Sequence, residues 1–588
     1  MSRKGMALFP AKASWQFTLV MVLSSIASLT VQAFTAPCRA SQLLGRRSVQ
    51  LPSPPTFSVG SIRMSAGSPP RDDKYLLDGE TEVFCNREIN MQQIRAIGFD
   101  MDYTLAQYNL AFELLAYDGA KQKLVDTFRY PEAVASFEYD STYFRRGLVI
   151  DKERGNVIKM DRHKYVRQAY HGFSPLPSAV RKSLYMASSE NIPLYTESTF
   201  VNIDTLFLLV DAYLFAQLVE YKDRHPSEIK HSYAAIYSHI RQCVDLCHRD
   251  GVIKDRVAED PGAYIVPDPG MVTMLEQYKE SGRKTFLVTN SLWEYTDVVM
   301  NFLVGNKGPR NQDWLDLFEV VIVGSRKPAF LEDRSAYMMR VAPADGSLRN
   351  VDGVEGPVDA FLAQGKVFQG GNWKHLLEML KLTSGDNVLY VGDHMYSDIL
   401  RSKRSLGWRT CLVIPELAGE VAALQQYAGL DAGLQELRRR RLVMDEEMDS
   451  LYKSIQVLRR EEKQGAQGGA STEPSPELKK LTRQLQELEE AGERLDDTIK
   501  AGCSDYHHKF HRVWGKLFES GFQESRFAKQ VSTYACVYTK KASNLGMVSP
   551  ERWFRTVRDS MPHDVYLALG LGGASQTEMV GADAGDPR

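Results

Sequence analysis

Two aspartates with a single residue between them are the most informative feature of this sequence. Asp100 and Asp102 stand in the segment FDMDYTL, residues 99–105, directly after an apolar run. Two carboxylates at the end of a buried strand can face one metal ion and one phosphate group together. A carboxylate accepts a phosphoryl group only if a cation and hydrogen-bond donors neutralise the incoming charge. Such a site therefore needs further acids and a cation from elsewhere in the chain.

Other groups suited to phosphate chemistry stand at the ends of other apolar runs. Thr289 ends one run, Lys327 follows a second, and Asp393 ends a third, with Asp398 close behind it. An isolated pair of aspartates is weak evidence, because such pairs are usually turns or helix caps. Four polar elements in this order, each after a predicted strand, are a strong signal for one shared site.

The apolar runs themselves predict a parallel α/β sheet, because they are continuous and are separated by long helical stretches. The runs are Ile94–Asp100, Lys284–Asn290, Phe318–Ser325, Asn387–Asp393 and Thr410–Glu416. In such sheets ligands bind beyond the carboxyl ends of the strands. About 180 residues separate the first two runs, which is more than a crossover helix needs, so we expect an inserted cap domain.

After Glu416 the sequence becomes helical and charged. Two apolar stripes with three- and four-residue spacing, Leu437–Leu458 and Leu478–Ile499, predict an antiparallel helical hairpin. The arginine run Arg438–Arg441 is then part of a solvated helix face rather than a nucleic-acid patch. The stripes also allow a homo-oligomer, because helix pairing between chains would satisfy the same pattern.

The composition is that of an ordinary globular protein. The chain has 588 residues, of which 43% are hydrophobic and 25% charged. Its 72 Lys and Arg residues nearly balance 74 Asp and Glu residues. The chain therefore has no overall positive charge that would attract nucleic acid as a partner. Any anionic ligand must be held by local chemistry. Seven scattered cysteines argue against a disulfide scaffold.

We expect six parts along the chain. They are a targeting leader at 1–71, the start of the α/β core at 72–109, the cap at 110–265, the rest of the core at 266–417, a helical extension with the hairpin at 418–569, and a disordered tail at 570–588. Residues 1–71 contain no Asp or Glu. They begin with basic residues, continue with an apolar run and end in a basic stretch rich in Ser and Pro. This order resembles the bipartite leaders of algae with secondary plastids. That resemblance implies cleavage and a plastid destination, with secretion as the alternative. We expect no stable membrane span in the mature protein.

The order of the four polar elements resembles the motifs of the haloacid dehalogenase-like superfamily. The resemblance implies a Rossmann-like α/β fold and a phosphatase or phosphotransferase, since dehalogenases lack an acid at the place of Asp102. Asp100 would be the nucleophile, and Asp102 would act as general acid and base. Thr289 and Lys327 would stabilise the phosphoryl group.

The same resemblance implies Mg²⁺ as cofactor. Asp100, the backbone carbonyl of Asp102 and Asp393 would hold the ion, because Mg²⁺ prefers oxygen ligands. Asp398 would orient Lys327 or the water shell of the ion. An acid at a helix start explains Asp398 equally well.

Longer stretches resemble the cytosolic purine 5′-nucleotidases and their nucleotidase-domain-containing relatives, from about Asn90 to Val565. These stretches are Ile97–Tyr108, Tyr139–Asp151, His171–Phe173, Thr289–Met300 and Phe510–Tyr538. The resemblance implies a purine nucleoside monophosphate of the IMP or GMP type as substrate. The residues that it assigns to the substrate are Arg241, Asp245 and His248 on one helix face, Lys254 after them, Phe200 stacking on the base, and Asn290.

Two other functions stay open at this point. The chain could act on another phosphate ester with the same chemistry, or it could be a pseudoenzyme that binds nucleotide and uses its hairpin for partners. Transfer of the phosphoryl group to an acceptor other than water is a further alternative.

Overall fold

The computed structural model describes residues 83–186, 195, 197–305, 312–351, 353–466 and 473–556. All of these residues belong to one compact unit. The predicted leader at 1–71 and the predicted tail at 570–588 lie outside the described residues. Within the described ranges, no helix is both long and apolar enough to cross a membrane.

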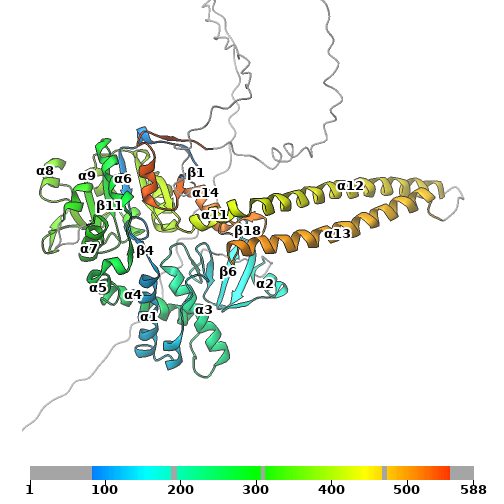
Figure 1. The fold of residues 1–588 in the computed structure, drawn as a ribbon, viewed down its shortest axis with the longest axis horizontal. Coiled ribbons are helices and arrows are strands. Elements are labelled where there is room, and N and C mark those ends of the chain that lie inside the picture. The colour runs from blue at the N-terminus through cyan, green and yellow to red at the C-terminus, as the bar shows by residue number, and fades with distance from the viewer. Residues whose placement is uncertain are drawn as a thin grey trace, which may run out of the picture. The chain divides into compact units, whose positions relative to one another are not determined.

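A central sheet of ten strands organises the described chain (Figure 1). Its order is β1-β20-β17-β16-β3-β11-β12-β15-β13-β14. The strands in that order are Phe84–Cys85, Val537–Thr539, Arg409–Val413, Val388–Gly392, Ala96–Phe99, Lys284–Val288, Val320–Val323, Val367–Gly370, Met338–Val341 and Leu348–Val351.

The prediction of a parallel α/β sheet is confirmed. The five predicted runs form β3, β11, β12, β16 and β17, which are neighbours in the sheet and pair in parallel. Two strands that the sequence did not reveal, β15 and β20, extend the parallel part at both sides. The outermost strands β1, β13 and β14 pair antiparallel to their neighbours.

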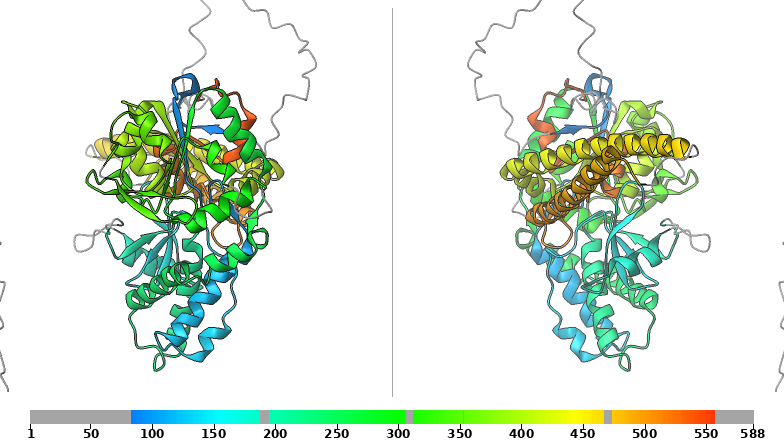
Figure 2. Two further views of the ribbon diagram at one scale, coloured as in Figure 1. Left: turned by 90° about the vertical axis from the view of Figure 1, so that its left-hand side faces the viewer. Right: turned by 90° about the vertical axis from the view of Figure 1, so that its right-hand side faces the viewer.

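Helices cover both faces of this sheet (Figure 2). Ile97 and Phe99 of β3 pack in one core cluster with residues of α6 (Pro269–Glu280) and α7 (Trp293–Leu303). Ala96 of the same strand packs in a second cluster, which includes residues of α8 (Val358–Ala363) and α9 (Trp373–Met379). Successive side chains of a strand point to opposite faces, so a strand covered on both sides is apolar throughout.

The chain leaves the central sheet after β4 (Gln107–Tyr108) and returns at β10 (Ile265–Val266). These two short strands pair with each other, Gln107 with Val266 and Tyr108 with Ile265. The described residues between them form an antiparallel sheet of order β8-β7-β6-β5-β9 and five α-helices. The elements are α1 (Leu110–Asp126), β5 (Val149–Asp151), β6 (Asn156–Met160), β7 (Val166–His171), β8 (Ser174–Pro175), α2 (Ser178–Tyr185), β9 (Phe200–Asn202), α3 (Leu208–Arg224), α4 (Tyr233–Arg249) and α5 (Lys254–Glu259).

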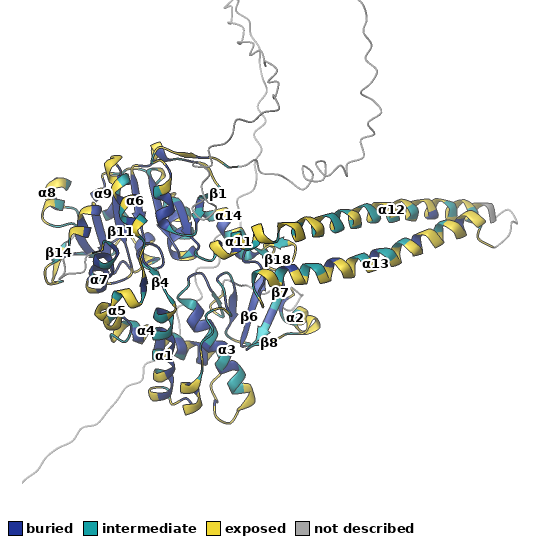
Figure 3. Cartoon of the chain, viewed as in Figure 1, coloured by how far each residue is buried: buried dark blue, intermediate teal, exposed yellow. Residues whose placement is uncertain are grey.

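Two long helices, α12 (Ala428–Ala466) and α13 (Pro476–Phe510), lie side by side. Ile455, Leu478 and Leu485 form their buried seam, whereas most of the remaining surface is exposed (Figure 3). Arg441 in the arginine run pairs with Asp496 of α13 at 3.0 Å. The apolar stripes are therefore used within the chain, and the arginine run contacts carboxylates.

The remaining helices and strands are short. Those of α or β type are β2 (Ile89–Asn90), α10 (Arg401–Leu406), α11 (Leu417–Gln426), β18 (Glu519–Ser520), β19 (Gln523–Glu524), α14 (Arg526–Tyr534) and β21 (Trp553–Phe554). Several 3₁₀ turns and one π-helix are also described, among them the π-helix η9 (Met395–Leu400) and the 3₁₀ helix η10 (Ala542–Met547).

Candidate active site

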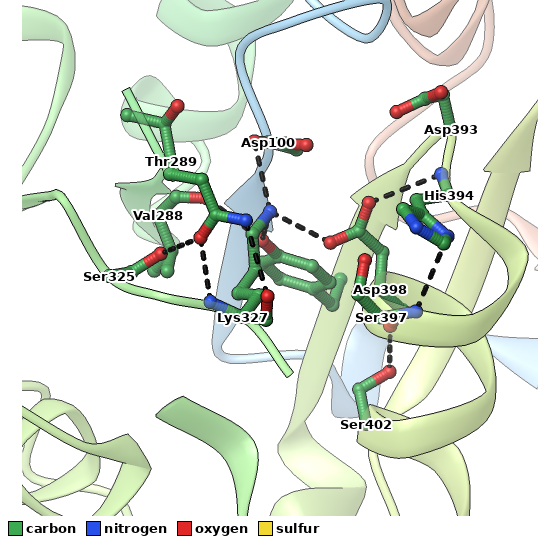
Figure 4. Close-up of polar contacts among 12 residues, drawn as sticks. Asp100, Val288, Thr289, Ser325, Lys327, Asp393, His394, Ser397, Asp398 and Ser402 are labelled. Atoms are coloured by element: carbon green, nitrogen blue, oxygen red, sulfur yellow. Dashed lines mark hydrogen bonds and ion pairs between the residues drawn. The ribbon is translucent and has the colours of Figure 1, made fainter. Parts of the chain in front are cut away.

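The polar residues singled out in the sequence follow four neighbouring strands of the central sheet. The strands β16, β3, β11 and β12 are adjacent and parallel. Their carboxyl ends therefore lie at one edge, where the loops carry Asp393, Asp100, Thr289 and Lys327. Figure 4 shows these side chains facing a common space. The sheet thus brings together residues that are far apart in the sequence.

Lys327 is the central cation of this cluster. Its Nζ lies 2.9 Å from Asp100 Oδ1 and 2.7 Å from Asp398 Oδ1, and it donates to the Tyr390 hydroxyl at 3.1 Å. Burial acts to lower the pKa of Lys327, but the carboxylates of Asp100 and Asp398 together raise that pKa well above its ordinary value. The ammonium therefore stays charged and offsets the charge of the acids around it.

Asn290 holds the loop that carries Lys327. Its Oδ1 accepts from the backbone N–H of Lys327 at 2.6 Å and from the Ser325 hydroxyl at 2.9 Å, and its Nδ2 donates to the Lys327 carbonyl at 3.3 Å. The sequence assigned Asn290 to the substrate. In the structure the side chain bonds the protein's own loop and so positions Lys327, and a contact of Asn290 with the substrate stays a prediction.

Asp102 stands apart from the other acids. Its carboxylate accepts hydrogen bonds from the Tyr108 hydroxyl at 2.6 Å and the Ser291 hydroxyl at 2.9 Å. Asp100 instead faces Lys327, and its Oδ1 also accepts from the backbone N–H of Met101 at 2.8 Å. The two aspartates of the FDMDYTL segment therefore have different environments, which is what separate chemical roles require.

Thr289 is fully buried beside this cluster. Its Oγ1 accepts from the backbone N–H of Ser291 at 3.1 Å. That contact fixes the hydroxyl oxygen and leaves the hydroxyl proton available for donation to a ligand.

The acids of the cluster fit a divalent cation. Carboxylate oxygens of Asp100, Asp393 and Asp398 lie within 4.8 Å of one another. Among the residues that the structure describes, one ammonium, that of Lys327, pairs with Asp100 and Asp398, and nearby Arg146 is paired with Glu416 at 2.6 Å. Buried acids in excess of cations are costly, and hard oxygen ligands suit Mg²⁺ or a similar ion. Asp398 joins this set, whereas the Asp102 carboxylate points elsewhere, so Asp102 could contribute only its backbone carbonyl.

Protonation of Asp393 competes with a cation at this place. Burial raises the pKa of Asp393 to about 7, and the Asp398 carboxylate adds to the effect. The Thr205 hydroxyl donates to Asp393 Oδ2 at 2.8 Å and acts in the opposite direction. Burial also raises the pKa of Asp100 well above its ordinary value, although Lys327 opposes that rise.

Of the residues assigned to the base, His248 and Lys254 are linked through aromatic side chains to the loop that carries Asp100 and Asp102, which we name the catalytic loop for the role proposed below. On α4, Arg241 donates to Asp211 of α3 at 2.6 Å and also to Asp245. Burial lowers the pKa of His248 to about 4, with Lys254 and Arg241 adding to the effect, so its imidazole is neutral. The Lys254 ammonium lies 5.2 Å from the ring centre of Tyr295, whose hydroxyl donates to that of Tyr108 at 3.1 Å.

The structure does not bring Phe200 to these residues. Phe200 belongs to a core cluster with Val149, on one face of the antiparallel sheet. The neighbouring residue Val201 and its partner Ile150 pack in the other cluster, which also contains residues of α3 and α4. Adjacent residues of a strand point to opposite faces, so the Phe200 ring lies on the face away from α4.

Phe207 occupies the position that we expected for Phe200. Its ring centre lies 5.9 Å from that of His248 and 4.7 Å from that of Tyr103 in the catalytic loop. The sequence contains no local sign of this contact or of the bond from Thr205 to Asp393, because the partners are far apart along the chain. The signal that could have identified Thr205 and Phe207 is the resemblance to the purine 5′-nucleotidases, had it been followed through residues 204–207.

Comparison with known proteins places the chain in the 5′ nucleotidase family. A sequence model of the 5′ nucleotidase family matches residues 83–566. Two curated relatives, both described as 5′-nucleotidase domain-containing protein 2 and found in Homo sapiens and Rattus norvegicus, are 32% identical over 358 residues. The match covers 59% of this chain and 65% and 61% of the two relatives, so it spans less than two thirds of their lengths.

A solved structure also aligns with this chain. It is the archaeal beta-phosphoglucomutase from Pyrococcus sp. strain ST 04, which is 10% identical over 54% of this chain and 86% of its own. The TM-score of 0.23 is low, so this likeness supports no statement about function.

Replacing Lys327 should destabilise the protein strongly. Lys327→Met leaves Asp100 and Asp398 buried without their cation, and removing one partner of such a pair costs about 3–5 kcal/mol. The matched control is Lys374→Met, since Lys374 is exposed and its contact with Glu378 is long, 3.8 Å; it should change the free energy of unfolding by less than about 0.5 kcal/mol. Urea unfolding of both metal-free variants at pH 8 measures the difference. Equal midpoints would show that Lys327 does not compensate these acids.

Cation binding should strengthen as the pH rises. A protonated Asp393 cannot serve as a ligand, so affinity should fall roughly tenfold for each pH unit below the pKa of about 7. In the metal-free protein this raised pKa also means that stability falls as the pH rises through about 7. Titration calorimetry with Mg²⁺ and Mn²⁺ at pH 6, 7 and 8 measures the affinity.

A variant of Thr205 tests whether Asp393 causes this pH dependence. Thr205→Val removes the hydroxyl that donates to Asp393, so the midpoint should move to higher pH, whereas Thr205→Ser should keep it. An affinity that stays constant between pH 6 and 8 would contradict the assignment.

Proposed function

The chain belongs to the 5′ nucleotidase family, and we propose that it is a Mg²⁺-dependent hydrolase of nucleoside 5′-monophosphates. One observation carries the proposal. Asp100 lies against the buried Lys327 ammonium at 2.9 Å, while Asp102, two residues away, is held by two hydroxyl groups. This arrangement offers a charge-compensated nucleophile beside an independent acid and base.

In the proposed reaction Asp100 attacks the phosphorus atom of the monophosphate. The bond from phosphorus to the ester oxygen breaks, Asp102 gives that oxygen a proton, and the nucleoside leaves. Asp102 then takes a proton from water, whose oxygen attacks the aspartyl-phosphate and releases phosphate. Asp100 returns to its starting state, so the protons and bonds balance over the cycle.

Neighbouring groups support each step. Lys327 offsets negative charge on the nucleophile and the phosphoryl group, and the Thr289 hydroxyl is available to donate to a phosphoryl oxygen. Mg²⁺, held by Asp100, Asp393 and the Asp102 carbonyl with Asp398 nearby, would supply positive charge to the phosphate. Tyr108 and Ser291 keep Asp102 directed away from the other acids.

For the substrate we propose a purine monophosphate of the IMP or GMP type. Arg241 and the neutral His248 offer hydrogen-bonding groups for the base, Asp245 offers an acceptor, and Lys254 lies beside them. Phe207 offers a ring against His248 and in contact with Tyr103 of the catalytic loop. Another phosphate ester, or transfer to an acceptor other than water, uses the same catalytic groups and is the alternative.

Two further predictions from the sequence remain proposals. We propose that residues 110–265 are a cap over the catalytic edge and that residues 1–71 are a cleaved leader to the plastid. A homo-oligomer, or a partner bound through α12 and α13, stays an alternative. The pseudoenzyme alternative is less favoured, because Asp100, Asp102 and Lys327 are all in place.

Phosphate release tests the catalytic proposal directly. With Mg²⁺, the protein should release phosphate from IMP and GMP, and EDTA should abolish this activity. Asp100→Asn should lower kcat by more than about 10³, since even one lost electrostatic partner costs 10² to 10³. Asp126→Asn, an exposed aspartate on α1, is the matched control and should keep full activity. No release from IMP, GMP, AMP, UMP or a sugar phosphate would leave only a binding role.

Base recognition is tested by a second substitution. Arg241→Ala should raise KM for IMP by about tenfold or more with little change in kcat, because it removes binding rather than chemistry. Arg249→Ala, about two turns further along α4, is the control, since Arg249 is exposed and its hydrogen bond to the Asp245 carbonyl is long, 3.4 Å. If Arg241→Ala affects IMP and a sugar phosphate equally, α4 does not read the base.

A further inference from the structure

A cavity outside the catalytic cluster lies where the chain passes between the central sheet and the segment from α1 to α5. Its volume is about 480 Å³, within the range of small-molecule sites. Both connecting strands contribute to its wall, Gln107 from β4 and Val266 from β10. The beginning of α6 and the segment η10 complete the wall. Figure 1 shows β4 at this passage.

One wall of the cavity is bonded to the catalytic loop. Gln107 donates from Nε2 to the Tyr103 carbonyl at 2.7 Å and to the Thr104 carbonyl at 3.4 Å. Both carbonyls belong to the loop that carries Asp100 and Asp102. A molecule that contacts Gln107 would therefore favour one arrangement of that loop, which is the physical requirement for coupling between two sites.

The lining has both apolar and polar parts. Pro269, Met274 and Met547 supply apolar surface, and methionine sulfur makes favourable contacts with aromatic rings. The polar side is formed by Thr273, Ser543 and the ion pair of Lys541 with Asp268, whose charged atoms are 3.8 Å apart. One cation and one anion cancel, so the cavity carries no net charge that would favour a phosphate.

Ser543 gives the cavity an unused hydrogen-bonding group. The residue is 4% exposed, and its hydroxyl has no hydrogen-bond partner in the described part of the chain. A buried polar group without a partner costs about 1–3 kcal/mol, which a ligand with a matching group recovers. The glycine at position 270 has no side chain, and a Cβ there would lie 3.5 Å from this hydroxyl.

We propose that this cavity binds an uncharged nucleoside. The concentration of nucleoside would thereby influence the conformation of the catalytic loop. The ring would lie against the methionine and proline side chains, and the sugar hydroxyls would meet Ser543, Thr273 and the Lys541–Asp268 pair. The choice of a nucleoside rests on the proposed function, because nucleosides are the products of that reaction. The cavity and its bond to the loop do not depend on it.

Binding of inosine, adenosine and uridine to the full chain tests the proposal. Titration calorimetry on Asp100→Asn measures binding without turnover, and ribose is the control ligand. Binding should persist when Arg241→Ala is added, because the cavity lies apart from α4. It should weaken by about tenfold or more when Thr273→Phe fills the cavity instead. Glu276→Phe, at an exposed position of α6 outside the cavity, should leave binding unchanged.

Three further measurements keep the test decisive if a variant is unstable. Ser543→Ala should also weaken binding, and thermal unfolding of Thr273→Phe is compared with that of Glu276→Phe. In Arg241→Ala, a bound nucleoside should slow hydrogen exchange in residues 101–108. The proposal would be overturned if binding is lost in Arg241→Ala but not in Thr273→Phe. It would also be overturned if no nucleoside binds at millimolar concentration. Phosphate release from IMP is measured separately, so failure of either proposal is recognised by itself.

Discussion

Charge compensation among buried groups is the constraint on which this structure depends. Asp100, Asp393 and Asp398 are brought within a few ångströms of one another at a sheet edge, with Lys327 as the ammonium between two of them. Removing such charges from water is costly unless each is paired and hydrogen-bonded. Each charged group of the cluster therefore depends on the others for its stability. The excess of acids over cations makes the cluster suited to binding a divalent cation.

The surrounding scaffold serves to hold that set in one geometry. Tyr390 donates to the Val288 carbonyl at 3.0 Å and accepts from Lys327, which ties the ammonium to the strands beneath it. Asn290 fixes the Lys327 loop through the backbone. Tyr390 and Val288 lie in strands inside the sheet, and Asn290 follows β11 closely, so small movements of the Lys327 loop are resisted, which is what a preorganised site requires.

The same sheet edge separates two aspartates that are almost adjacent in the chain. Asp100 is paired with an ammonium, whereas Asp102 accepts from Tyr108 and Ser291. Tyr108 begins the passage to the α1–α5 segment, and Tyr295 links it towards Lys254. The catalytic loop, the residues beside α4 and the cavity at Gln107 therefore share one connected set of contacts, which gives a physical route for coupling between them.

The sequence by itself determined the parallel sheet, the strand ends that carry the candidate catalytic residues, and the family. Buried strands are continuously apolar, and the polar residues that ligands contact follow directly where such strands end. It did not determine β15 and β20, the role of Asn290, or the ring beside His248, which is Phe207 and not Phe200. Those features depend on partners far away in the chain, such as Thr205 and Asp393, whose bond joins residues 188 positions apart. Local pattern specifies which residues a strand buries and where it stops, whereas only tertiary packing decides which side chains meet across the site.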